Sequence, residues 1–180
     1  MKLTSLLAGL FVVVPALLLS GCDGGTKHEK GNILNRQASI TLPAGFIKMP
    51  EDLLKTMYPQ AQRPNEAWYV ESEKSKVSFA FSQTAQAMTD AQLPGFAEAM
   101  KNQFSAFSPK VSEIKVNGKK AIRIEVLTPD TTNPGGTQIF NVMQFSSMNG
   151  KLLIAAFNTT VDLQEKYQQS GKAALDTLTW

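Results

Sequence analysis

The sequence predicts an α+β domain with a mainly antiparallel sheet of about six or seven strands, flanked by helices. Two Asn-Gly pairs, at 117–118 and 149–150, each lie between strand-like segments, and this pair is the strongest short signal of a β-hairpin. Segments 89–104 and 162–180 carry apolar residues at helical spacing. Hairpin-linked strands without a regular strand–helix alternation favour an α+β fold over an α/β fold.

The first half of the domain predicts three strands and one short helix. Residues 39–42 alternate apolar and polar side chains until Pro43 ends the strand. A short helix is expected between Pro50 and Pro59, with acids in its first turn. Residues 67–71 and 76–82 are strand candidates, the second of which alternates apolar with polar or small residues, and their short separation predicts a hairpin.

The second half predicts two hairpins and two helices. Pro94 fits a helix only in its first turn, so the regular helix is expected to begin near Gln92 or Leu93. The hairpin strands are expected at 111–116 with 119–127, and at 138–147 with 151–158. The last helix is predicted to be weakened at Ser170 and Gly171.

The N-terminus predicts export. Lys2 precedes an apolar run from Leu6 to Leu19, which is too short to span a bilayer and is interrupted by Pro15. The run ends in Leu19-Ser20-Gly21-Cys22, which resembles the lipobox of bacterial lipoproteins. That resemblance implies cleavage before Cys22, with acyl chains on this residue. A plain signal peptide with a chance cysteine is the alternative.

Asp23 follows the cysteine. In enterobacterial lipoproteins that resemble this one, an aspartate at this position marks retention at the inner membrane. For a Gram-negative source, the expected location is therefore the periplasmic face of the inner membrane.

We divide the chain into a signal peptide (1–21), a lipidated cysteine with a flexible spacer (22–36) and a single domain (37–180). The formal charge of +3 falls to +2 without residues 1–21, which contain one lysine and no acid. This near-neutral balance argues against a nucleic-acid partner. Cys22 is the only cysteine, so its use as an anchor excludes disulfides.

No motif predicts catalysis, a metal or a cofactor. His28, the only histidine, lies in the expected spacer, so a Ser-His-Asp arrangement in the domain is excluded. The acidic pair Glu51-Asp52 suits a helix N-terminus, and Glu71 with Glu73 is expected on one exposed face of a strand. The methionines lack the clustered spacing of a copper site and are expected in the core.

Two groups of residues are candidates for partner contact. Lys119 and Lys120 belong to a basic cluster around the Asn117-Gly118 turn, although edge-strand lysines also prevent aggregation between sheets. The large aromatic residues Trp68, Tyr69 and Trp180 are candidate anchors. Because side chains alternate along a strand, one of Trp68 and Tyr69 must face the core.

Three short stretches resemble the DcrB family of bacterial envelope lipoproteins, within the broader PsbP-like structural group. They are 40–46 (ITLPAGF), 116–121 (VNGKKA) and 175–178 (LDTL). The resemblance implies an antiparallel sheet sandwiched by helices and supplies no catalytic residue. The Eag chaperones of type VI secretion, more distant relatives in this group, cradle hydrophobic effector helices.

These observations leave three functional hypotheses. The first is a lipid-anchored, non-enzymatic module of the envelope that holds a protein or peptide partner near the inner membrane. The second is a chaperone or immunity-type lipoprotein that masks an apolar segment of a secreted or phage protein. The third is an enzyme that uses carboxylates or a Ser-Lys pair.

Overall fold

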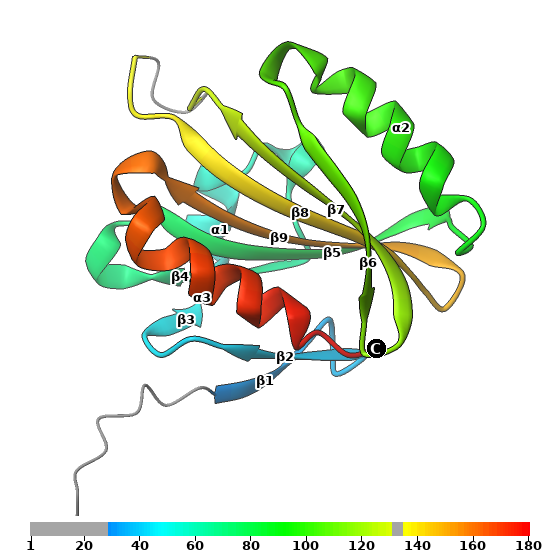
Figure 1. The fold of residues 1–180 in the computed structure, drawn as a ribbon. Coiled ribbons are helices and arrows are strands. Elements are labelled where there is room, and N and C mark those ends of the chain that lie inside the picture. Colours follow the sequence, from blue (N-terminus) through cyan, green and yellow to red (C-terminus); the bar gives the residue numbers. More distant parts are fainter. Residues whose placement is uncertain (1–28, 131–134) are drawn as a thin grey trace, which may run out of the picture.

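A seven-stranded antiparallel sheet forms the centre of the protein (Figure 1). The computed structural model describes residues 29–130 and 135–180. The strand order is β3-β4-β5-β9-β8-β7-β6. The strands are β3 (Phe46–Lys48), β4 (Glu66–Val70), β5 (Val77–Ala87), β6 (Lys110–Val116), β7 (Lys119–Thr128), β8 (Ile139–Met148) and β9 (Lys151–Thr160).

Both predicted Asn-Gly hairpins are present. Asn117 and Gly118 have φ angles of 48° and 81°, and Asn149 and Gly150 have φ angles of 54° and 72°. Asparagine and glycine tolerate this left-handed backbone, which a two-residue hairpin turn requires at both positions. The turns therefore fix the registers of β6 with β7 and of β8 with β9.

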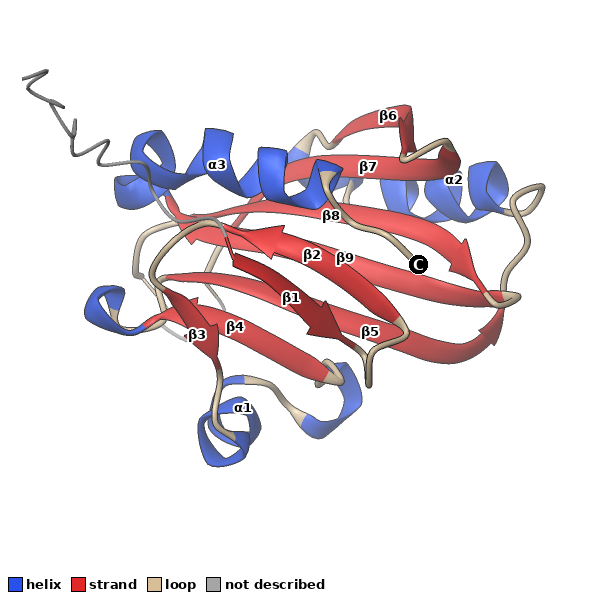
Figure 2. Ribbon diagram, turned by 90° about the horizontal axis from the view of Figure 1, so that it is seen from below, coloured by secondary structure: helices blue, strands red, loops and turns tan. Residues whose placement is uncertain are grey.

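One face of the sheet is covered by a small hairpin and the last helix (Figure 2). The hairpin pairs β1 (Glu29–Ile33) with β2 (Ala38–Leu42), and the helix is α3 (Gln164–Asp176). Phe79, Phe81 and Phe157 are fully buried beneath this layer. The rings of Phe79 and Phe157 lie 5.2 Å apart, within the range of favourable aromatic pairs.

The opposite face is covered by α1 (Glu51–Met57) and α2 (Leu93–Gln103). Leu93 and Ala97 of α2 pack against Ile122, Ile124 and Phe145. The helix α2 begins at Leu93 with Pro94 in its first turn, as the sequence predicts. Helices therefore cover both faces of an antiparallel sheet, and the predicted α+β class is confirmed.

The folded part of the chain begins earlier than the sequence predicts. Residues 29–36, expected in the flexible spacer, form β1 and the turn that follows it, so that expectation is wrong for these residues. Ile33 and Leu34 are only 1% and 6% exposed, because their side chains pack into the core. The other residues of β1 are polar or glycine. The rest of the expected spacer, 22–28, lies outside the described residues.

The helix α3 is not interrupted at Ser170 and Gly171. An added Cβ atom at Gly171 would lie 2.6 Å from ring atoms of Phe157. The glycine therefore allows the helix to approach β9 closely, and packing outweighs its low helix propensity. The helix ends at Asp176, and Trp180, predicted within it, belongs to the segment that follows.

Glu71 and Glu73 do not lie in a strand as predicted. They form a short 3-10 turn, η2 (Glu71–Glu73), between β4 and β5. Glu73 accepts hydrogen bonds from the Lys166 ammonium at 2.6 Å and from the Tyr167 hydroxyl at 3.0 Å. The turn is thereby attached to the first part of α3. Further 3-10 turns are η1 (Gln60–Gln62), η3 (Ser105–Phe107) and η4 (Val161–Leu163).

The sheet has two distinct ends, which position the candidate site. At the near end, β1 begins at Glu29, paired with Leu42, and β4 and β9 finish. At the far end lie the turns at 34–37, 117–118 and 149–150. Within the described ranges, no helix has the length and apolar character needed to cross a membrane.

Candidate functional site

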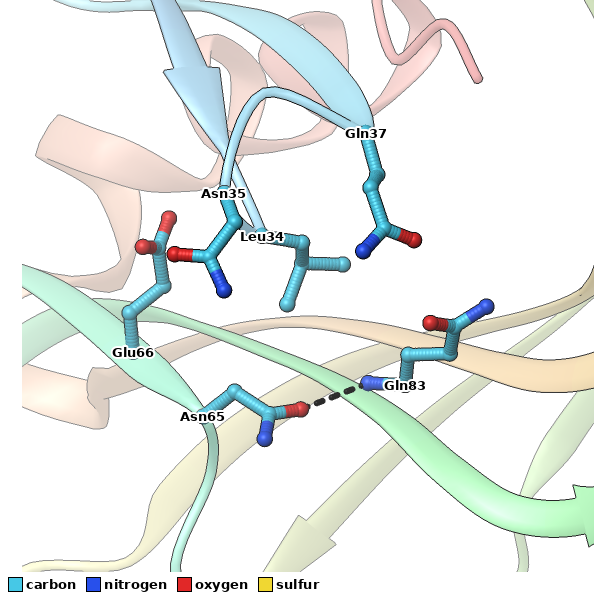
Figure 3. Close-up of a pocket in the computed structure, with 6 residues that line it drawn as sticks. All are labelled: Leu34, Asn35, Gln37, Asn65, Glu66 and Gln83. Carbon is cyan, nitrogen blue, oxygen red and sulfur yellow. Dashed lines mark hydrogen bonds between the residues drawn. The ribbon is translucent and has the colours of Figure 1, made fainter.

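A polar pocket of about 130 Å³ lies at the far end, between the β1–β2 turn and strands β4 and β5 (Figure 3). Four carboxamide side chains, one carboxylate and one apolar side chain line it. They are Asn35, Gln37, Asn65, Gln83, Glu66 and Leu34. The chain thus brings together residues from three separate segments.

The roof of the pocket is a strained turn. Leu34, Asn35 and Arg36 have φ angles of 52°, 54° and 66°. Residues other than glycine adopt this left-handed region at a cost and rarely in succession. The turn is held by a hydrogen bond from the Gln37 amide to the Leu34 carbonyl at 3.1 Å and by the burial of Leu34. Backbone strain of this kind concentrates at functional sites.

The floor of the pocket is fixed by hydrogen bonds to the sheet. The Gln83 backbone amide donates to Asn65 Oδ1 at 2.8 Å (Figure 3). The Gln83 side-chain amide donates to the Met148 carbonyl at 3.0 Å. Both carboxamides are therefore oriented before any ligand arrives, which lowers the entropy cost of binding.

Glu66 is the charged residue of the pocket. Its residue surface is only 8% exposed, and Oε2 accepts a hydrogen bond from the Lys48 ammonium at 3.0 Å. The other oxygen, Oε1, is buried and has no hydrogen-bond partner. A buried acceptor without a partner lowers the stability of the folded state. Oε1 is therefore the clearest acceptor in this pocket for a donor group of a ligand.

A second depression of about 490 Å³ adjoins the pocket and shares Asn65 and Glu66 with it. Three cationic side chains and two acidic ones line it: Lys48, Lys55, Arg63, Glu51 and Glu66. Lys55 and Glu51 form an ion pair at 2.6 Å, and this ammonium lowers the pKa of the Glu51 carboxyl. With three cationic and two acidic side chains, this lining has a net charge of +1.

A separate polar cluster holds α3 to the sheet. Arg123 of β7 is 7% exposed and donates to Gln144 at 2.8 Å and to Asp176 at 2.6 Å. Gln144 donates in turn to the Leu175 carbonyl at the end of α3. A cation near a helix C-terminus also interacts favourably with the helix dipole. Asp176 also lines an open depression along α3, but Arg123 itself lines none of the described pockets, and we interpret the cluster as structural.

Trp68 and Tyr69 point to opposite faces of β4, as alternation requires. Tyr69 is 7% exposed and packs with α1, whereas Trp68 is half-buried against the larger core. The Trp68 ring lies under Gly31 of β1, and its indole Nε1 is buried without a hydrogen-bond partner. Trp68 therefore presents more surface than Tyr69, and partner contact by either stays a prediction.

The structure brings Lys119 and Trp180 together at the far end. The Lys119 ammonium lies 4.8 Å from the centre of the Trp180 ring and also donates to the Trp180 carbonyl. The Trp180 indole donates to the Ser147 carbonyl at 2.7 Å. Lys120 pairs with Glu113 at 3.4 Å. These three predicted residues share the end of the sheet that carries the pocket, and their contact role stays a prediction.

Cys22 and Asp23, the predicted lipidation and sorting residues, lie outside the described residues. Within the part that the structure describes, no three His, Cys, Asp or Glu side chains gather to hold a metal ion.

The pocket residues were missed at the level of sequence. One signal for Glu66 was present, because it shares the alternation that places Trp68 and Val70 on the core face of β4. An acid at such a position is unusual enough to indicate a special role. The Leu34–Gln37 turn had no comparable signal, since its glycine-free sequence does not indicate left-handed backbone.

The antiparallel sheet between a helical layer and a layer of hairpin and helix defines a PsbP-like sandwich. No family model matches the sequence, and no curated protein is significantly similar to it. Solved structures resemble the fold at low identity. Cyanobacterial PsbP (CyanoP) from Synechocystis is 10% identical with a TM-score of 0.53, over 89% of this chain and 98% of that one.

Two further solved structures are similar. A protein from Bacteroides thetaiotaomicron is 10% identical with a TM-score of 0.52, and the match covers 84% of this chain and 48% of that chain. LpqN of Mycobacterium tuberculosis, described as involved in cell envelope biogenesis, is 12% identical over 87% of this chain and 86% of that one. Its TM-score of 0.49 is too low to support an inference. The likeness to CyanoP shows the fold alone.

Proposed function

We propose that the protein is a lipid-anchored, non-enzymatic accessory module of the bacterial envelope, which holds a protein or peptide partner near the periplasmic face of the inner membrane. In this proposal Cys22 carries the acyl chains, Asp23 retains the protein at the inner membrane, and the far end of the sheet binds the partner. The lipobox-like sequence supports the anchor.

One observation carries the binding role. The polar pocket and the Lys119–Trp180 pair both lie at the far end, whereas β1 begins at the near end with Glu29. A preformed pocket with fixed polar groups is typical of a recognition site. The placement leaves these groups accessible when the near end is held at the membrane.

The distance to the anchor supports this orientation. Seven residue steps separate Cys22 from Glu29, so the chain reaches at most about 25 Å even when fully extended. The ten-residue strand β9 is about 33 Å long. A domain that stands with its far end on the bilayer would need a longer connection, so the far end is expected to project from the membrane or lie along it.

Site-specific crosslinking in native membranes tests the proposal. A photoreactive residue at Arg36, in the turn beside the pocket, or at Lys119 should trap one defined envelope protein or peptide. The same residue at Glu98, on the exposed face of α2, is the matched control and should not trap it. Repeated recovery of the protein alone from both far-end positions would contradict the proposal.

A second candidate, the masking of an apolar segment, has one observation in its favour. Met143, Ala156 and Ala80 are directly paired across β8, β9 and β5, and all three are half-buried on the face that also carries α1 and α2. The large apolar side chains exposed in the described chain lie on four different elements: Ile47, Phe107, Leu127 and Val161. Ala156→Asp should abolish binding of an apolar helix if this face is the site.

A further inference from the structure

The chemistry of the far-end pocket restricts what it can bind. Glu66 Oε1 lacks a hydrogen-bond donor, while Asn35, Gln37 and Asn65 supply carboxamide groups that can both donate and accept. Leu34 adds a single apolar contact. A complementary ligand group therefore carries at least one donor, at least one acceptor and a short apolar stem.

The charge and the size of the pocket restrict the ligand group further. Lys48 already neutralises Glu66, so a second cation is not required, and an anion would be repelled by the carboxylate. A volume of about 130 Å³ accommodates one small side chain and excludes a folded chain segment. A neutral carboxamide meets all of these conditions, since its NH₂ group donates to Oε1 and its carbonyl accepts from the pocket amides.

Asn35 lines the pocket together with Glu66. In Figure 3 the Asn35 carboxamide lies beside the Glu66 carboxylate at the edge of the pocket. Asn35 is exposed and sits at the centre of the left-handed turn, so its side chain can turn away. A ligand carboxamide can then occupy the same position against the carboxylate.

We propose that this pocket receives the side chain of a glutamine or asparagine from the partner peptide. This inference rests on the proposed function and specifies its partner. The adjoining depression shares Asn65 and Glu66 with the pocket and carries one positive charge in excess. The peptide residues next to the inserted side chain are therefore acidic, which complements Arg63, the cation of this lining that forms no ion pair within the described part of the chain.

A titration followed by NMR tests the proposal. The purified full-length protein, in detergent micelles, is titrated with N-acetylglutamine amide, and the side-chain amide signals of Asn35, Gln37, Asn65 and Gln83 are followed. N-acetylglutamate amide has nearly the same shape but a negative charge at the tip. We expect a saturable shift with the glutamine probe and at least fivefold weaker binding of the glutamate probe.

Matched variants assign the binding to the pocket. Gln37→Ala removes an exposed pocket side chain and should weaken binding of the glutamine probe at least fivefold. Gln86→Ala removes an exposed side chain near the end of β5, outside the pocket lining, and should leave binding unchanged. Both positions are exposed, so neither variant is expected to unfold the protein.

Three results would overturn the inference: no saturable shift, equal binding of both probes, or tighter binding of N-acetylglucosamine, which would indicate an amino sugar as the ligand. The titration does not depend on the membrane. A partner trapped at Arg36 without probe binding would show that only the pocket assignment is wrong. Probe binding without a trapped partner would show that the proposed function is wrong.

Discussion

Gly171 lies where α3 approaches Phe157 of the sheet closely. An alanine Cβ there would overlap the Phe157 ring at 2.6 Å, and Phe157 is fully buried against the Phe79 ring. Overpacking of this kind costs about 1–3 kcal/mol, which exceeds the roughly 1 kcal/mol that alanine gains in helix propensity. We expect Gly171→Ala to lower the free energy of unfolding, measured by urea denaturation.

Gly95 in α2 is the matched control for this prediction. Nothing lies within 4 Å of a Cβ atom added there, and its backbone is helical. Gly95→Ala is therefore expected to raise the free energy of unfolding by about 0.5–1 kcal/mol. The same sign of change in both variants would contradict the role assigned to Gly171.

Arg123 and Asp176 form an asymmetric ion pair, because the Arg123 side chain is 8% exposed and that of Asp176 is 58% exposed. Arg123→Met leaves the buried Gln144 Oε1 without its donor, which is expected to cost about 1–3 kcal/mol. Asp176→Asn keeps a hydrogen-bond acceptor at a solvated position and should cost less than about 1 kcal/mol. Urea denaturation of both variants measures the difference, and equal losses would contradict this account.

At the scale of elements, β1 is the segment whose structure differs most from the sequence prediction. Ile33 is 1% exposed, so Ile33→Ala is expected to cost about 2–5 kcal/mol, whereas the exposed Asn32→Ala should have little effect. If 29–36 were a flexible spacer, both variants would be neutral. Hydrogen exchange gives a second measurement, since the amides that pair β1 with β2 should be protected.

The contact between η2 and α3 predicts a dependence of stability on pH. Hydrogen bonds from Lys166 and Tyr167 lower the pKa of the Glu73 carboxyl below 4.5. The nearby Thr160 side chain and the Lys76 ammonium, which donates to Asp162 at 3.0 Å, lower the pKa of the Asp162 carboxyl. The unfolded chain therefore takes up these protons first as the pH falls, and stability present above about pH 5 is lost toward pH 3.

Thermal denaturation at pH 6 and pH 3 measures this effect. The Tm of the unmodified protein should be lower at pH 3. The difference should be smaller in Glu73→Gln, which keeps the shape of the side chain but cannot titrate. An unchanged difference in this variant would show that other carboxyl groups are responsible.

Local signals predicted strands β4 to β9 of the main sheet but not the three-residue β3. Long-range packing explains the other features that they missed. The Asn-Gly turns and the proline at the start of α2 depend on backbone conformation alone, which neighbouring residues determine. The strand character of β1 depends on Ile33 meeting a core assembled from distant residues. The pocket forms where a glycine-free left-handed turn packs beside Glu66. No local sequence pattern specifies this long-range arrangement.

At the scale of the whole molecule, the two ends of the sheet differ in composition. The far end carries Arg36, Lys119 and Lys151 in or beside its turns, together with the polar pocket. At the near end, the lysines Lys76 and Lys166 are paired with Asp162 and Glu73. The near end also carries the exposed Lys30, Lys74 and Lys110, so the polar pocket, rather than an excess of cations, distinguishes the far end.

The anchor itself gives the prediction that belongs to the whole molecule. Acyl chains contribute about 0.8 kcal/mol per buried methylene, and two or three chains on one residue are sufficient for stable membrane attachment. Cys22→Ser should therefore move the protein from the membrane fraction to the soluble fraction after cell fractionation, without changing its Tm. Asp23→Ser should keep it in the membrane fraction but move it to the outer membrane. Membrane attachment that survives Cys22→Ser, with the signal peptide cleaved, would contradict the lipid anchor, because the described domain would then have to supply the attachment.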